Sequence, residues 1–175
     1  MLSTTLLLAA SIVVGQADDT DIKYEKLKAL MPIIGTWHRV LPVSAQGQRW
    51  ETQHIYTWAA NKKCIEGDVR LRAANTDGAW GTVSRRYFVW NLKTEQIEQY
   101  QINTWGGGVK VQAWIPRGSG VFTVDHITDT KKQDAETSDT TVTITFEDMT
   151  TVSTNRKSAD GEKLEDEELV LQRIR

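Results

Sequence analysis

The stretch IIGTWHRV, residues 33–40, decides the fold of this chain because the hydrophobic periodicity changes within it. Apolar residues at helical spacing lead into it, namely Leu27, Leu30, Met31 and Ile34. They predict a short helix, which Pro32 should end or distort and Gly35 should break. From Thr36 onward apolar and polar residues alternate, which is typical of β-strands. Trp37 therefore stands at the beginning of the first strand, directly after a helix.

The rest of the chain is divided by turn signals rich in Gly, Asn and Asp into about nine strands. The strands are predicted near residues 36–43, 49–60, 64–74, 82–92, 96–105, 109–115, 121–128, 141–148 and 164–174, with 150–158 as an alternative tenth. Short connections and the lack of intervening helices predict an antiparallel meander. Because an open sheet of this size leaves two unpaired edges, we expect a closed all-β barrel of about 8–10 strands with a short N-terminal helix.

Trp37 is predicted to fill one end of this barrel, which the short helix would cross. Gly35 would let the chain turn sharply from the helix into the first strand. In a closed barrel the last strand neighbours the first, so the C-terminal sequence LVLQRIR places Arg173 or Arg175 over the Trp37 ring. Such a cation–π contact is worth about 0.5–2 kcal/mol.

The order of these features resembles the lipocalin (calycin) architecture: a short helix, Gly35-Thr36-Trp37, an antiparallel meander and a basic residue on the last strand. More narrowly, the chain is similar to a group of exported bacterial lipocalin-like proteins of uncharacterised function, which often carry L-x-x-L-x-x-x-x-G-x-W and later tryptophans on successive strands. The matching residues are Leu27, Leu30, Gly35, Trp37, Trp90, Trp105 and Trp114. The resemblance implies one lipocalin-like barrel domain over residues 18–175. The longer motif of the extracellular lipocalins is not visible, so no retinol-like or steroid-like ligand is implied.

Residues 1–17 have the pattern of a signal peptide. An apolar run from Leu6 to Val14 is followed by the small residues Gly15 and Ala17, and charged residues begin at Asp18. No Lys or Arg precedes the run, and a membrane anchor is the alternative, but the run is shorter than the roughly 20 residues that span a bilayer. The sequence therefore predicts export, periplasmic or secreted, with no membrane span after the signal is removed.

Charge and cysteine content narrow the possible partners. The 175-residue chain has a net charge of -2, which argues against a nucleic-acid partner because such proteins present a basic face. Cys64 is the single cysteine, so an internal disulfide is excluded. It is predicted to pack as a small apolar residue, the alternative being a thiol activated by Lys62 and Lys63.

One face of the predicted strand 49–60 is aromatic with polar groups, as a ligand cavity would be. With positions on later strands it yields the cavity candidates Trp50, His54, Tyr56, Trp58, Arg86, Phe88, Trp90, Tyr100 and Trp114. Arg85 and Arg86 belong to opposite faces, and an inward arginine is unfavourable unless it meets a carboxylate, an anionic ligand or rim solvent. Gln99 and Gln101 alternate with Tyr100 and line either a polar cavity or the barrel exterior. The alternative for the aromatic face is a filled core.

Motifs of the common catalytic and metal sites are missing from the sequence. His38, His54 and His126 are scattered without metal-ligand spacing, and no nucleophile elbow or phosphate-binding loop is present. We therefore predict no metal, no cofactor and no catalytic residue. The leading hypothesis is an exported barrel that binds a small hydrophobic or amphipathic molecule. The alternatives are a filled structural or interaction domain, and an enzymatic or haem-binding barrel of the nitrobindin type with His126 as the best candidate ligand.

Overall fold

The computed structural model describes residues 19–106, 108–129, 139–154, 165 and 167–175. The predicted signal peptide, residues 1–17, lies outside this part of the chain. The described part begins with the helix α1 (Asp19–Leu27) and the 3-10 segment η1 (Lys28–Ile33), and the strands follow. These are β1 (Gly35–Val40), β2 (Trp50–Trp58), β3 (Cys64–Ala73), β4 (Gly81–Asn91), β5 (Gln96–Asn103), β6 (Val109–Gly118), β7 (Val121–Asp129), β8 (Asp139–Ile144), β9 (Asp148–Thr154) and β10 (Glu167–Ile174).

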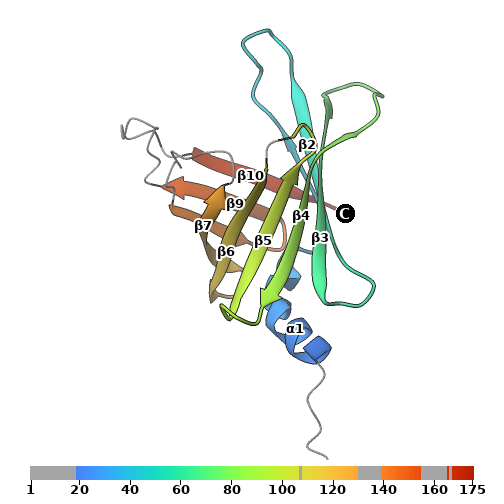
Figure 1. Cartoon of the computed structure of the whole chain (residues 1–175). Coiled ribbons are helices and arrows are strands. Elements are labelled where there is room, and N and C mark those ends of the chain that lie inside the picture. Colours follow the sequence, from blue (N-terminus) through green and yellow to red (C-terminus); the bar gives the residue numbers. More distant parts are fainter. Residues whose placement is uncertain (1–18, 107, 130–138, 155–164, 166) are drawn as a thin grey trace, which may run out of the picture.

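The strands form one closed antiparallel barrel, which confirms the predicted fold class. Each strand pairs with its neighbours in sequence, and β1 closes the barrel by pairing with β10, with Trp37 opposite Arg173. Closure leaves no sheet edge unpaired, which is the physical reason for the barrel. Figure 1 shows α1 at one end of the barrel, beyond the lower ends of β4 and β5. No helix in the described part of the chain is long and apolar enough to cross a bilayer.

The region after residue 140 differs from the main prediction and follows the alternative of a tenth strand. We expected one strand over 141–148, with Phe146 continuing the alternation of Val142 and Ile144. Instead the chain bends between β8 and β9, where the backbone N–H of Thr145 donates to the carbonyl of Asp148. Phe146 lies in this bend with 73% of its surface exposed, and the Arg175 guanidinium lies 5.3 Å from its ring centroid.

The helical segment closes one end of the barrel with apolar side chains. Leu27, Leu30 and Ile33 are fully or almost fully buried and belong to one cluster with Trp37. Above them a row of aromatic rings crosses the barrel, from Tyr56 to Phe88, Trp114 and Phe122, with successive centroids 5.8, 5.1 and 5.7 Å apart. Edge-to-face and tilted rings at these distances pack favourably. This half of the barrel is therefore a filled core.

Candidate functional site

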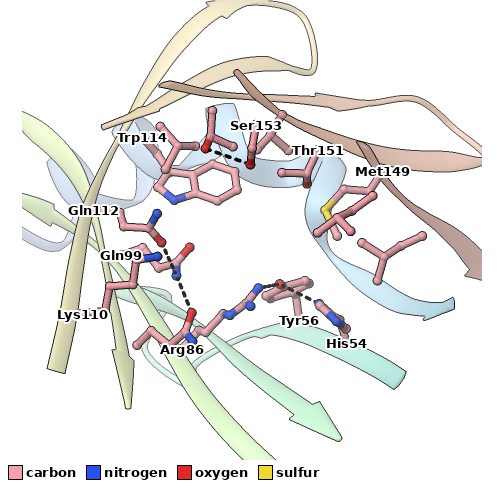
Figure 2. A pocket seen from close by; sticks show the side chains of 16 residues that line it. His54, Tyr56, Arg86, Gln99, Lys110, Gln112, Trp114, Met149, Thr151 and Ser153 are labelled. Carbon is pink, nitrogen blue, oxygen red and sulfur yellow. Dashed lines mark hydrogen bonds between the residues drawn. The ribbon is translucent and has the colours of Figure 1, made fainter. Parts of the chain in front are cut away.

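The other half of the barrel contains a cavity of about 310 Å³ (Figure 2). One side, here called the polar wall, comes from β2, β4, β5 and β6 and comprises His54, Tyr56, Arg86, Gln99 and Gln112. The opposite side, here called the apolar wall, comes from β7 to β10 and comprises Val124, Val142, Met149, Leu169 and Leu171. The hydroxyl groups of Thr151 and Ser153 adjoin the apolar wall, as Figure 2 shows. The cavity is thus two-sided, with hydrogen-bonding groups facing hydrocarbon.

A hydrogen-bonded chain of three side chains organises the polar wall (Figure 2). Arg86 Nη1 donates to Tyr56 Oη at 2.7 Å, and Tyr56 Oη lies 3.5 Å from His54 Nδ1. Burial, together with the positive charges of Arg86 and Arg39, holds the pKa of His54 well below its usual value near 6.5. His54 is therefore neutral at neutral pH. Since the Tyr56 oxygen accepts from Arg86, its own proton can be donated to Nδ1 in the His54 tautomer that carries its proton on Nε2.

The backbone of β3 sets the position of Tyr56. Tyr56 pairs with Gly67, and Gly67 pairs with Arg86 on the next strand, so the three residues form one row across the sheet. A Cβ atom at Gly67 would lie 2.6 Å from two ring carbons of Tyr56. Glycine is needed here because the phenol ring lies flat over the strand backbone. This close approach brings the Tyr56 hydroxyl to the guanidinium of Arg86.

Buried amides complete the polar wall. Gln99 Nε2 donates to Gln112 Oε1 at 3.2 Å, and both glutamines are almost fully buried. Gln101 also lines the cavity, so β5 turns its glutamines inward. Buried polar side chains in proteins are almost always hydrogen-bonded, as these two glutamines are. Here they give the interior fixed donors and acceptors next to Arg86.

A second cavity of about 320 Å³ adjoins the first towards the end of the barrel remote from α1. The two share Arg86 and Gln101, so the Arg86 side chain borders both cavities. Trp105, which is 74% exposed, lines the second cavity in the connection between β5 and β6. Arg86 is therefore reachable from the end of the barrel that the helix does not cover.

Of the nine cavity candidates predicted from the sequence, those that line the first cavity are His54, Tyr56, Arg86 and Trp114. Phe88 is fully buried beneath them and touches the rings of Tyr56 and Trp114. Sequence reasoning did not select Gln112, Met149 or Leu171. For Met149 and Leu171 the available signal was the alternation along β8 to β10. We missed it because the predicted strand 141–148 runs through the bend at Phe146.

The remaining candidates lie elsewhere. The Trp58 ring packs at a tilt against Tyr24 of α1 with centroids 5.2 Å apart, and Lys26 Nζ lies 5.2 Å from the centroid of Trp90. Both tryptophans therefore anchor the helix rather than line the cavity. Trp50 begins β2 opposite Ala73 and is not part of the cavity lining.

Tyr100 lies on the outer face of β5, opposite to the predicted orientation. Its hydroxyl donates to Glu98 Oε2 at 2.7 Å, and this hydrogen bond, with smaller contributions from burial and the charge of Glu98, raises the pKa of Tyr100. Glu98 is itself buried on this outer face, beside Asn91 and Thr94, whose side chains donate to its Oε1. Because both faces of β5 carry buried polar residues, alternation alone did not reveal the inward face.

The closed end is built around Trp37, Gly35 and Arg173. Trp37 is fully buried, and its indole N–H donates to the Ile33 carbonyl at 2.8 Å. The Arg173 guanidinium lies 4.2 Å from the Trp37 ring centroid and donates to the carbonyls of Ile34 and Pro32, each at 2.6 Å. The structure places Arg173, and not Arg175, in this role.

A polar cluster on the outer surface joins the first three strands. His38 Nε2 lies 2.7 Å from Glu51 Oε2, and Arg72 Nε donates to Glu51 Oε1. Burial raises the pKa of Glu51, but these hydrogen bonds and the two basic groups outweigh it and lower the pKa overall. The Trp80 ring lies over Arg72, with the guanidinium 4.4 Å from its centroid. The carboxylate is fully paired, so this cluster is a structural contact between strands.

Other reactive groups contribute no site of their own in the described part of the chain. No three His, Cys, Asp or Glu residues there gather as metal ligands. Partial burial, and then the charge of Glu66, raises the pKa of the Cys64 thiol, which leaves it protonated at neutral pH. The backbone of His126 pairs with Gln112, and its side chain lies outside what the structure describes.

These features define a closed ten-stranded antiparallel barrel with a helix-covered, filled end and a two-sided interior cavity. No protein-family model matches the chain, and no curated protein shows significant sequence similarity to it. The function is therefore inferred from the barrel interior.

Proposed function

We propose that this protein is an exported, lipocalin-like barrel that binds a small, partly apolar molecule in its interior. The observation that carries the proposal is the cavity of about 310 Å³ between the polar wall and the apolar wall. Small-molecule sites start near this volume, combine an apolar lining with a few placed polar groups, and occur in the mouths of β-barrels. The order of helix, Gly-x-Trp motif and meander supports the lipocalin-like assignment.

The contrast between the two halves of the barrel favours a ligand over the filled-barrel alternative. Aromatic rings fill the half next to α1, so the chain has residues large enough to fill a barrel of this width. In the other half, Thr140, Thr151 and Ser153 stand where larger apolar residues would close the space. Protein interiors are otherwise close-packed, and a void of this size lowers the stability of the empty protein, so its presence favours a ligand that occupies it.

Export is part of the proposal and is supported by residues 1–17. Their apolar run, followed by Gly15 and Ala17, has the pattern of a cleaved signal. Expression of the full chain, followed by mass measurement of the protein in the cell fractions, tests this point. A product that begins near residue 18 outside the cytoplasm supports export. A full-length product retained in the cytoplasm refutes it.

Binding is tested by native mass spectrometry and absorption of the protein as purified, and by titration with the neutral fluorescent probe N-phenyl-1-naphthylamine. Thr151 and Thr150 are neighbours on β9 that face opposite sides of the sheet, and only Thr151 lines the cavity. We expect Thr151→Trp to fill the cavity and weaken probe binding by about tenfold or more, whereas Thr150→Trp leaves it within about twofold. Equal binding by both variants would show that the probe does not occupy the barrel interior.

A further inference from the structure

The arginine inside the barrel differs from its neighbours outside it. On the outer face of β3 and β4 each arginine has a carboxylate beside it: Arg72 contacts Glu51, while Arg70 and Arg85 lie 3.4 and 3.6 Å from the carboxylate oxygens of Asp68. Arg86 faces the interior, and within the described residues it forms no ion pair. The one hydrogen bond that its side chain makes to another described side chain goes to the hydroxyl of Tyr56.

The charge of Arg86 is not compensated by a carboxylate of the cavity lining. Among the described lining residues there is no Asp or Glu. His54, the other titratable base, is held neutral by burial and by the charge of Arg86, through a lowered pKa. A guanidinium in a partly desolvated interior is unfavourable unless an anion accompanies it.

Two side chains that line the cavity carry hydrogen-bond donors without a partner. Among the described residues, the buried atoms Arg86 Nε and Trp114 Nε1 have no hydrogen-bond partner. Both groups donate and cannot accept. The local hydrogen-bonding balance at these two side chains therefore favours a ligand with acceptors over one with donors only.

The guanidinium of Arg86 can meet such an acceptor through one of its terminal nitrogens. Nη1 is occupied by the Tyr56 hydroxyl and Nε is buried, whereas Nη2 donates to no side chain of the described residues. A guanidinium is a planar fork of N–H groups and suits the oxygens of a carboxylate or sulfonate better than the ammonium of a lysine does. Tyr56, fixed over Gly67, holds the Arg86 guanidinium in place.

We infer that the ligand is an amphipathic organic anion, whose carboxylate or similar oxyanion pairs with the guanidinium of Arg86 while its hydrocarbon part packs against Met149 and Leu171. This inference rests on the proposed function and names the chemical class of the ligand. The polar and apolar walls lie opposite each other in Figure 2, so one short molecule can reach both. A neutral hydrocarbon would pack against the apolar wall only and leave the charge of Arg86 without a counter-ion.

Two fluorescent probes separate the head group from the hydrocarbon. 1-Anilinonaphthalene-8-sulfonate and N-phenyl-1-naphthylamine share one aromatic skeleton, and only the first carries a sulfonate. We expect Arg86→Gln to weaken binding of the sulfonate probe by about tenfold to a hundredfold and to change binding of the neutral probe by less than about threefold. The matched control Arg85→Gln removes the adjacent, outward arginine and should leave both affinities within about twofold.

Near-UV circular dichroism verifies that each variant keeps its packed core. If Arg86→Gln does not fold, Arg86→Lys carries the test, because it keeps the charge and removes the fork. Arg86→Lys should weaken the sulfonate probe by several-fold and leave the neutral probe unchanged.

The outcomes distinguish the two proposals. If Arg86→Gln weakens both probes equally, or neither, while Thr151→Trp still blocks the neutral probe, the anion inference is overturned and interior binding stands. If neither probe binds the wild-type protein, or Thr151→Trp blocks nothing, the proposed function fails and the inference falls with it. Selective loss of the sulfonate probe supports both.

Discussion

The sharpest stability prediction concerns Gly35 and Arg173 at the closed end of the barrel. Gly35 has φ = +134°, and a Cβ atom there would lie 2.6 Å from Arg173 Nη1. The guanidinium has little freedom to move away, because it donates to the carbonyls of Ile34 and Pro32 and lies over Trp37. Gly35→Ala therefore imposes two penalties, a strained backbone and a displaced Arg173.

The magnitudes follow from these contacts. Backbone strain at positive φ costs about 1–3 kcal/mol, hydrogen bonds from a charged donor contribute about 1.5–3 kcal/mol, and a cation–π contact about 0.5–2 kcal/mol. We expect Gly35→Ala to lower the free energy of unfolding by about 3–5 kcal/mol and Arg173→Met by about 2–4 kcal/mol. In the double variant no guanidinium remains to be displaced. The loss in free energy of unfolding of the double variant should therefore be about 2 kcal/mol smaller than the sum of the losses of the two single variants.

Urea unfolding followed by far-UV circular dichroism measures these energies. Gly47→Ala is the matched control, since Gly47 also has a positive φ, +77°, but nothing lies within 4 Å of its Cβ position. It isolates the backbone penalty, about 1 kcal/mol, and should be additive with Arg173→Met. Additive costs for Gly35→Ala and Arg173→Met, within about 0.5 kcal/mol, would refute the steric and electrostatic coupling described above.

Three further predictions concern Trp37, His54 and Trp58. Trp37→Ala should lower the free energy of unfolding by about 3–5 kcal/mol in the same assay, because the ring is fully buried and hydrogen-bonded, and a loss below about 1 kcal/mol would contradict its role in filling the barrel end. The pKa of His54 is lower in the folded than in the unfolded chain, so below about pH 6.5 the unfolded chain takes up the proton first. Urea unfolding at about pH 7 and about pH 5.5 should therefore show a stability that falls as pH decreases, by up to about 1.4 kcal/mol per pH unit. The variant His54→Gln should lose this part of the pH dependence. Identical pH dependence in the wild-type protein and the variant would contradict a neutral, buried His54. Trp58→Ala should lower stability and leave binding of N-phenyl-1-naphthylamine within about twofold, since Trp58 packs on Tyr24 outside the cavity, and the reverse order of effects would place Trp58 in the ligand site.

The sequence alone determined the barrel and its closed end. Turn signals at regular intervals and alternating apolar residues predicted an antiparallel meander, and the need to pair both sheet edges predicted closure. The Gly-x-Trp motif and the basic C-terminal strand narrowed the partner of Trp37 to Arg173 or Arg175. These features are local or depend only on strand order, so no knowledge of tertiary packing was needed.

Only the tertiary structure decided which residues form the cavity. Alternation divides a strand into two faces but does not say which face is inward, and buried polar residues on both sides of β5 left Tyr100 and Gln99 indistinguishable. The same ambiguity applied to Arg85 and Arg86, and the row of Tyr56, Gly67 and Arg86 across the sheet resolves it.

Irregular positions added a second source of ambiguity. Extra residues interrupt the alternation of β4 opposite Val69 and Arg70, of β7 opposite Val111 and Gln112, and of β6 between Pro116 and Gly118. The bend at Phe146 ends the alternation of β8. The cavity also takes its lining from β2 and from β4 to β10, so no single segment of sequence contains its pattern. The inward face of a strand is fixed by pairing with strands that are far away in sequence. This is why the sequence predicted the barrel architecture but not the full lining of the cavity.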